Sequence, residues 1–136
     1  MDQLGSPLSV VLFSGTDDKL GAAAVLAVGA AVMGRSVNVF LQYYAVDAFR
    51  SDRIAADHGL DPEATPAQRS IVTAHPGQHW SELLRQAKDL GDVKTAPALR
   101  QLAPGERKND LIEGVEEPAG AATALAAAEG AMTLFI

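Results

Sequence analysis

The chain has 136 residues, a net charge of -6 and a sequence pI of about 4.9. This length is typical of one domain with its own core, so we expect a single α/β domain over residues 1–136. The Lys and Arg residues form no basic stripe, which disfavours nucleic-acid binding. The absence of cysteine excludes disulfides and thiolate chemistry by this chain alone.

Residues 1–7 lack the basic and apolar regions of a secretion signal. The longest uncharged stretch, residues 20–34, is shorter than the roughly 20 residues that span a bilayer. We therefore expect a cytoplasmic protein that has no membrane partner.

The first part of the sequence predicts a βαβ unit. Ser9–Phe13 is an apolar, β-branched run typical of a buried strand, and Ser14–Asp18 is typical of a turn that caps a helix. Residues 19–33 carry no charge after the first position, which predicts a helix buried nearly all round, with the sheet on one side and a second subunit on the other. Gly34 favours a helix end, and a second strand is expected over Ser36–Leu41.

A long excursion is expected between the second strand and the next long helix. Residues 45–50 suggest a short helix or turn, and residues 51–77 contain three prolines and little periodicity, which predicts at most one short helix. Apolar residues at three- and four-residue spacing then predict an amphipathic helix over Trp80–Leu90 that ends at Gly91.

The last third predicts three further strands and one more helix. The strands are expected at residues 93–96, 111–115 and 131–136, and an Ala-rich helix at 119–128. Five strands that alternate with helices predict a layered α/β fold with a parallel sheet.

Three segments together resemble a known family. They are residues 13–19 leading into an Ala-rich helix that closes at Met33-Gly34, residues 40–46, and residues 111–115 with Gly120 and the terminal 133–136. In this order they resemble the DsrE/DsrF-like family, in particular its peroxiredoxin-like DsrE branch.

The resemblance implies a fold, an assembly and a chemistry. It implies a flavodoxin-like three-layer sandwich with a mostly parallel five-stranded sheet, a homo-oligomer (trimer or hexamer), and a link to sulfur metabolism. In that branch a cysteine normally follows the third strand, and the equivalent place in this chain is Pro97 or Ala98. Cysteine-dependent sulfurtransferase or peroxidase chemistry is therefore excluded for this chain alone, and no catalytic residue is assigned.

A binding crevice is expected at the carboxyl ends of the strands, where the strand order of an open α/β sheet reverses. In a flavodoxin-like order the first and third strands flank this point, which would bring residues 14–19 close to residues 97–100. The candidate ligand-binding residues are Ser14, Gly15, Asp18, Lys19, Tyr43, Tyr44, Pro97, Ala98 and Arg100.

Two of these candidate groups have plainer interpretations. The turn before the first helix offers backbone N–H groups to a small polar ligand, but Asp17 and Asp18 oppose a phosphate, and simple helix capping is the other interpretation. Tyr43 and Tyr44 suit an interface or a pocket wall better than a catalytic phenol.

Neither a metal nor a cofactor is expected. His75 and His79 lie four residues apart with His58 upstream, but Pro76 and Gly77 between them disfavour the continuous helix that would bring both imidazoles to one metal.

The sequence thus favours a non-catalytic or thiol-independent DsrE-like subunit that oligomerises and binds a partner or a small ligand. A cysteine-bearing homologue is one such partner. The alternatives are a sulfur-relay or redox enzyme that uses the thiol of a partner or substrate, and a flavin or nucleotide binder suggested by fold analogy.

Overall fold

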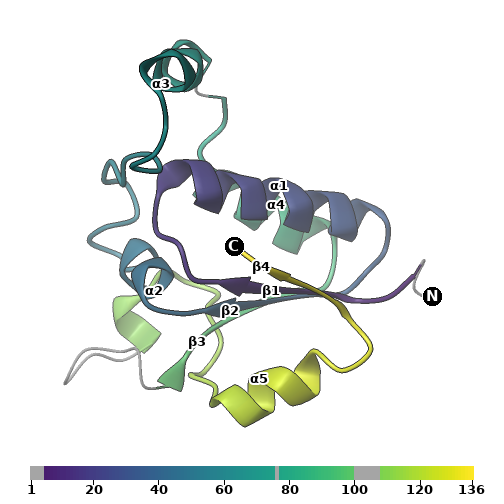
Figure 1. The fold of residues 1–136 in the computed structure, drawn as a ribbon. Helices are drawn as coiled ribbons and strands as arrows, with labels where there is room; N and C mark the ends of the chain where they lie inside the picture. Colours follow the sequence, from purple (N-terminus) through teal and green to yellow (C-terminus); the bar gives the residue numbers. More distant parts are fainter. Residues whose placement is uncertain (1–4, 76, 100–107) are drawn as a thin grey trace.

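The computed structural model describes residues 5–75, 77–99 and 108–136, and its centre is a parallel four-stranded sheet. The strands are β1 (Leu8–Leu12), β2 (Val37–Leu41), β3 (Val93–Pro97) and β4 (Met132–Phe135), in the order β3-β2-β1-β4. Helices α1 (Asp17–Val32) and α4 (Trp80–Leu90) lie on one face of the sheet, and α5 (Ala121–Ala127) lies on the other (Figure 1). The α/β class with a parallel sheet is confirmed.

The core lies between the sheet and helix α1. Alternate strand residues such as Val10, Leu12 and Val39 point toward it and are buried. The buried side of α1 is mostly alanine, which lets the helix lie close to the sheet and to α4.

The opposite side of α1 is exposed within the chain. Val25, Leu26, Val32 and Met33 are 44–68% exposed. Within one copy of the chain only the side toward the sheet and α4 is covered, and burial of the other side by a second subunit stays a prediction.

Helix α4 follows its sequence pattern closely. Trp80, Leu84 and Ala87 are buried at the predicted spacing, and the helix ends at Gly91 as expected. The Trp80 ring packs against Phe49 with their centroids 5.0 Å apart. The amphipathic prediction is confirmed.

The expected strand at residues 111–115 is not formed, so the prediction of five strands is wrong. Leu111 makes an isolated antiparallel bridge to Arg50, and Val115 makes an isolated parallel bridge to Thr95. Between these buried ends Gly114 has a φ of 86°, which interrupts the extended backbone. The apolar residues thus mark two anchor points with a turn between them.

The strand order also corrects the expected neighbours of β1. β2 pairs with both β1 and β3, so that Leu41 lies between Leu12 and Pro97 in register. Residues 14–19 and 97–99 are therefore separated by one intervening strand. The strand order reverses between β1 and β4 instead, since β2 and β3 extend the sheet on the other side of β1.

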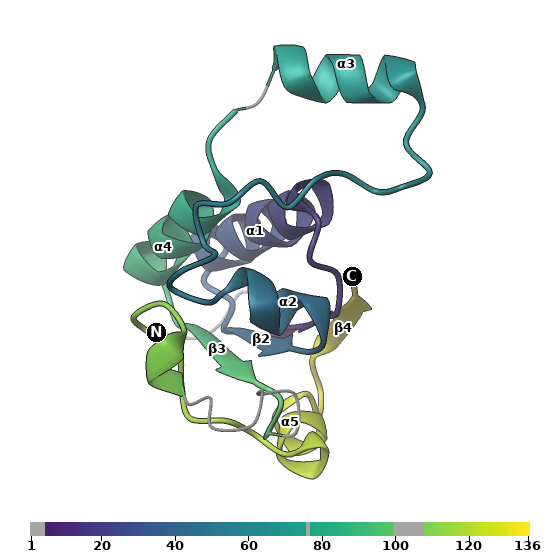
Figure 2. The same ribbon diagram turned by 90° about the vertical axis from the view of Figure 1, so that its left-hand side faces the viewer.

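The chain between β2 and α4 contains two short helices, of which the second lies in the excursion at residues 51–77. Helix α2 (Tyr44–Ala48) follows β2 directly, and α3 (Pro66–Ala74) is the one short helix expected within residues 51–77. Helix α3 stands away from the other elements in both ribbon views (Figures 1 and 2). In the described ranges, no helix has the length and apolar character needed to cross a membrane.

We predict that Leu84→Ala lowers the free energy of unfolding by about 2–4 kcal/mol, because it empties a buried position beneath α1. Leu90→Ala on the same helix is the matched control, since Leu90 is 57% exposed, and it should cost far less. Urea unfolding monitored by circular dichroism measures both values. Equal losses would contradict the assignment of the buried face of α4.

Candidate functional site

A cavity of about 700 Å³ lies beyond the carboxyl ends of β1 and β2. The end of β1 and the first turn of α1 form one wall, α2 forms another, and the excursion at residues 53–62 closes the third. The lining residues are Phe13, Ser14, Gly15, Thr16, Lys19, Tyr44, Asp47, Arg53, Asp57, His58 and Pro62. This volume falls in the range typical of small-molecule sites.

Four of the predicted ligand-binding residues line this cavity. Ser14, Gly15 and Lys19 come from the turn after β1 and from α1, and Tyr44 is the first residue of α2. The sequence therefore predicted one wall of the cavity from the position of the turn after a buried strand.

The other predicted residues lie elsewhere. Asp18 lines a second hollow, Tyr43 packs on Phe13 outside the cavity lining, and Pro97 and Ala98 are buried beyond β2. Arg100 lies outside the described residues. The expected meeting of residues 14–19 with residues 97–98 is wrong because β2 separates them.

Gly15 is required by the close approach of the backbone at Tyr44. A Cβ atom added to Gly15 would lie 2.6 Å from the carbonyl oxygen of Tyr44. The neighbouring carbonyl of Phe13 accepts a hydrogen bond from the N–H of Ala45. These contacts fix α2 against the turn, and thereby fix two walls of the cavity.

The N-terminus of α1 is already hydrogen-bonded by the protein. The N–H of Asp17 donates to the carbonyl of Gly59 at 2.8 Å, and the N–H of Lys19 donates to Oδ1 of Asp18 at 2.9 Å. These amides are not free for a ligand, and two carboxylates lie at the same helix end. The excursion and Asp18 thus satisfy these two amides, while the N-cap residue Thr16 makes no side-chain capping hydrogen bond.

The carboxylate of Asp17 connects three segments. Its Oδ2 accepts from the N–H of His58 at 3.1 Å, and its Oδ1 accepts from Nε1 of Trp80 at 3.0 Å. The third wall of the cavity and the start of α4 are therefore both attached to the first turn of α1.

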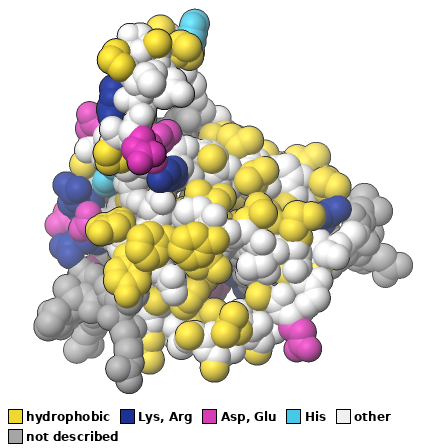
Figure 3. Space-filling view, viewed as in Figure 1, with side chains coloured by type: hydrophobic (Ala, Val, Ile, Leu, Met, Phe, Trp, Pro, Cys, Tyr) yellow, Lys and Arg dark blue, Asp and Glu magenta, His cyan; other side chains and the backbone are white. Residues whose placement is uncertain are grey.

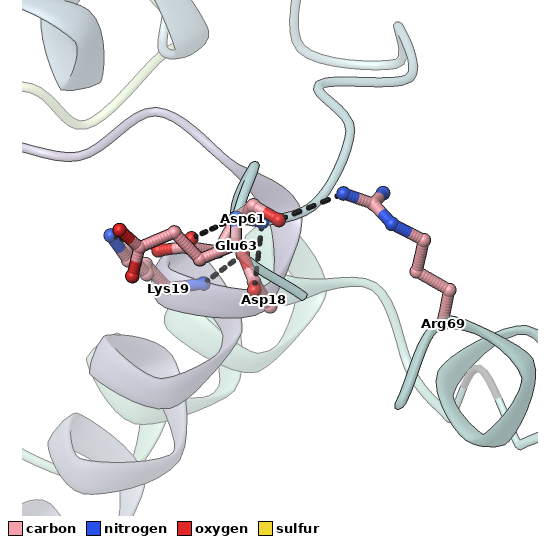
Figure 4. A network of polar contacts seen from close by, with 5 residues as sticks. All are labelled: Asp18, Lys19, Asp61, Glu63 and Arg69. Carbon is pink, nitrogen blue, oxygen red and sulfur yellow. Dashed lines mark hydrogen bonds and ion pairs between the residues drawn. The ribbon is translucent and has the colours of Figure 1, made fainter. Parts of the chain in front are cut away.

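Asp18 and Lys19 attach the excursion at a second point (Figure 4). The N–H of Asp61 donates to Oδ2 of Asp18 at 3.1 Å, and Nζ of Lys19 lies 2.7 Å from Oδ2 of Asp61. Partial burial raises the pKa of Asp18, but the hydrogen bonds to its carboxylate outweigh burial, so this pKa lies below its usual value. The hydrogen bond with Lys19 likewise lowers the pKa of Asp61.

Each of the two cations that line the cavity has a carboxylate partner. Lys19 pairs with Asp61, and Nε of Arg53 lies 3.2 Å from Oδ2 of Asp47. Asp57 also lines the cavity and accepts from the N–H of Gly59. The site therefore lacks the surplus of positive charge that a phosphate group prefers.

Several lining residues were missed by the sequence analysis. Asp47, Arg53, Asp57, His58 and Pro62 come from α2 and the excursion, whose path the pattern did not define. The one available signal was the unusual length of the excursion, since long loops within compact domains are commonly functional.

An exposed aromatic cluster adjoins the cavity. Phe13 contacts Tyr43, Tyr44 and Phe135 with centroid distances of 4.8, 5.6 and 5.7 Å, and these three rings are 55–68% exposed. Tyr43 also has a φ of 46°, which is strained for a tyrosine. Figure 3 shows a broad band of hydrophobic side chains on this face of the molecule.

The histidines have structural positions. His79 caps α4 by accepting from the N–H of Ser81, and His75 ends α3. His58 lies against Trp80 on the cavity wall. The described residues contain no group of three or more His, Asp or Glu side chains placed to hold a metal ion.

The comparisons with known proteins agree with the resemblance. The model of the DsrE/DsrF/DrsH-like family matches residues 6–75, slightly more than half of the chain. The chain belongs to the DsrE/DsrF/DrsH-like family. The match covers β1, α1, β2, α2 and α3, and so includes all the residues that line the cavity. A search of curated proteins found no match.

We predict that Gly15→Ala destabilises the protein by about 1–3 kcal/mol, since the added methyl group would overlap the backbone of Tyr44. Gly21→Ala is the matched control, because no atom from outside the neighbouring backbone of α1 lies within 4 Å of its added Cβ. Replacing a glycine inside a helix by alanine should raise the free energy of unfolding by about 0.5–1 kcal/mol. Thermal unfolding of both variants measures the difference, and a neutral Gly15→Ala would contradict the close approach.

We predict that acid unfolding depends on Asp18. Because its folded pKa is lowered, its contribution is present above the unfolded value of about 3.9 and is lost as the pH falls through the folded value. Asp18→Asn should therefore reduce the loss of stability on acidification below about pH 4. Urea unfolding at a series of pH values measures this loss. The exposed Glu129→Gln is the control and should keep the acid dependence of the parent.

Proposed function

We propose that this DsrE-like chain is a thiol-independent subunit that acts in sulfur metabolism by assembling with further subunits and binding a small ligand or a partner. One observation supports this above others: the cavity at the carboxyl end of β1 is well formed in a chain that has no cysteine. Membership of the family supports the link to sulfur metabolism. The absence of a thiol means that any sulfur carried through the site belongs to a partner or a substrate.

The apolar surface supports the assembly. The aromatic cluster around Phe13 and the outer side of α1 are both exposed in one copy of the chain. Exposed aromatic groups of this kind are common anchors of protein interfaces. A homo-oligomer (trimer or hexamer), or an assembly with a cysteine-bearing homologue, would cover them.

The cavity favours an uncharged or zwitterionic ligand. Its cations have carboxylate partners, and the N–H groups of Asp17 and Lys19 at the start of α1 have acceptors within the protein. Phe13, Tyr44 and Pro62 supply apolar surface for a ligand. These features favour such a ligand over the phosphate-bearing flavin or nucleotide of the second alternative.

The enzyme alternative uses the same cavity. A thiol of a substrate or partner that entered the cavity beside Tyr44 would share the cavity with the cationic side chains of Lys19 and Arg53.

We also propose that the domain has a flavodoxin-like three-layer architecture. Helices on both faces of the sheet support this proposal (Figure 1).

We predict that Phe135→Ser dissociates the assembly, because it removes a ring that is 68% exposed and packed on Phe13. Leu125→Ser on α5 is the matched control, since Leu125 is 73% exposed and lies outside the aromatic cluster, and it should leave the assembly intact. Size-exclusion chromatography with light scattering measures the mass of each variant. A monomeric parent protein, or equal masses for all three, would contradict the role of the cluster.

A further inference from the structure

A second hollow of about 340 Å³, here called the α3 groove, lies between α3 and the first turn of α1. Its lining combines carboxylates with apolar side chains. The lining residues are Asp18, Leu60, Asp61, Glu63, Ala64, Gln68 and Val72. The groove is separate from the cavity beside Tyr44, because the two share no lining residue.

Helix α3 is held in shape by local interactions and not by a core. Thr65 and Gln68 form a reciprocal capping box, and Pro66 occupies the first turn. The guanidinium of Arg69 donates to the carbonyl of Asp61 at 2.9 Å (Figure 4). It also donates to the carbonyl of Ala64 at 3.3 Å. The helix thus has a defined orientation relative to residues 61–64.

The same helix has no buried residue. Ile71 and Val72 are 63% and 42% exposed, and helices this short are marginal in water without packing. The local caps therefore hold in place a helix whose apolar side chains Ile71 and Val72 are largely exposed.

The α3 groove has more carboxylates than cations, which favours a positively charged partner group. Asp18 and Asp61 are each hydrogen-bonded within the molecule, whereas, among the described residues, the carboxylate of Glu63 has only a longer-range electrostatic interaction with Lys19, whose ion-pair partner is Asp61. Three carboxylates face two cations, Lys19 and Arg69, in this network (Figure 4), and the whole chain carries a net charge of -6. These carboxylates are not placed to coordinate a metal, as judged over the described residues. The remaining negative charge suits an organic cation.

We propose that the α3 groove docks a basic side chain, flanked by apolar residues, from a segment of a partner protein. The cationic head would lie beside Glu63, and the aliphatic stem would lie on Leu60, Ala64 and Val72. This surface is distinct from the cavity and from the aromatic cluster, so the proposal goes beyond the function given above.

The test uses two capped tripeptides and the full chain. Acetyl-leucyl-arginyl-leucinamide is the probe, and its citrulline analogue is a neutral control of nearly the same shape. Two-dimensional amide NMR titrations should show shifts at residues 60–72, with the arginine peptide binding about threefold more tightly than the citrulline peptide, as one exposed charge pair allows.

Two charge-neutralising variants make the test specific. Glu63→Gln should remove the preference for arginine, and Glu129→Gln, at an exposed position next to α5, should keep it. Both positions are exposed, and the parent-like spectrum of each variant checks its fold. Equal affinity for the two peptides, no saturable shift, shifts outside the groove, or an unchanged preference in Glu63→Gln would overturn the proposal. None of these results would bear on the cavity beside Tyr44.

Discussion

The carboxylates in the first turn of α1 hold together segments that are far apart in the sequence. Asp17 accepts hydrogen bonds from His58 and from Trp80, and Asp18 accepts one from Asp61. A carboxylate at a helix N-terminus is favoured by the helix dipole, and here it also satisfies the backbone of a long loop. The excursion is thereby held beside the end of β1, where it closes both the cavity and the α3 groove.

Much of the fold was predictable because its signals are local. The apolar runs of β1 and β2, the spacing along α4 and the end at Gly91 each depend on neighbouring residues. The strand at residues 111–115 was predicted wrongly, since an apolar run cannot distinguish a strand from two buried anchors that flank a turn at Gly114. The order of the strands is a long-range property, and the sequence pattern does not encode it directly.

In the candidate site, too, the residues with a local sequence signal were predicted and those placed by long-range contacts were not. Ser14, Gly15, Lys19 and Tyr44 were found because turns after buried strands lie at one edge of a parallel sheet. The residues from the excursion were not found, because hydrogen bonds to the first turn of α1 determine its path and local propensity does not. Pro97 was included through an assumed neighbour relation between β1 and β3, which the position of β2 rules out.

These features describe a member of the DsrE/DsrF/DrsH-like family that has a cavity at the carboxyl end of β1 and no cysteine. The α3 groove shares no lining residue with the cavity, whereas the aromatic cluster adjoins the cavity and shares Phe13 and Tyr44 with it. The binding and assembly that we propose would use all three surfaces. Because the chain has no cysteine, thiol-dependent chemistry at the cavity would need a thiol from a partner or a substrate.

The most direct test of this central claim is native mass spectrometry of the protein purified gently from its own host. We expect an assembly of several copies, or of this chain with a cysteine-bearing homologue, and a retained small molecule would further support the binding role. A bare monomer without ligand or partner would contradict the claim.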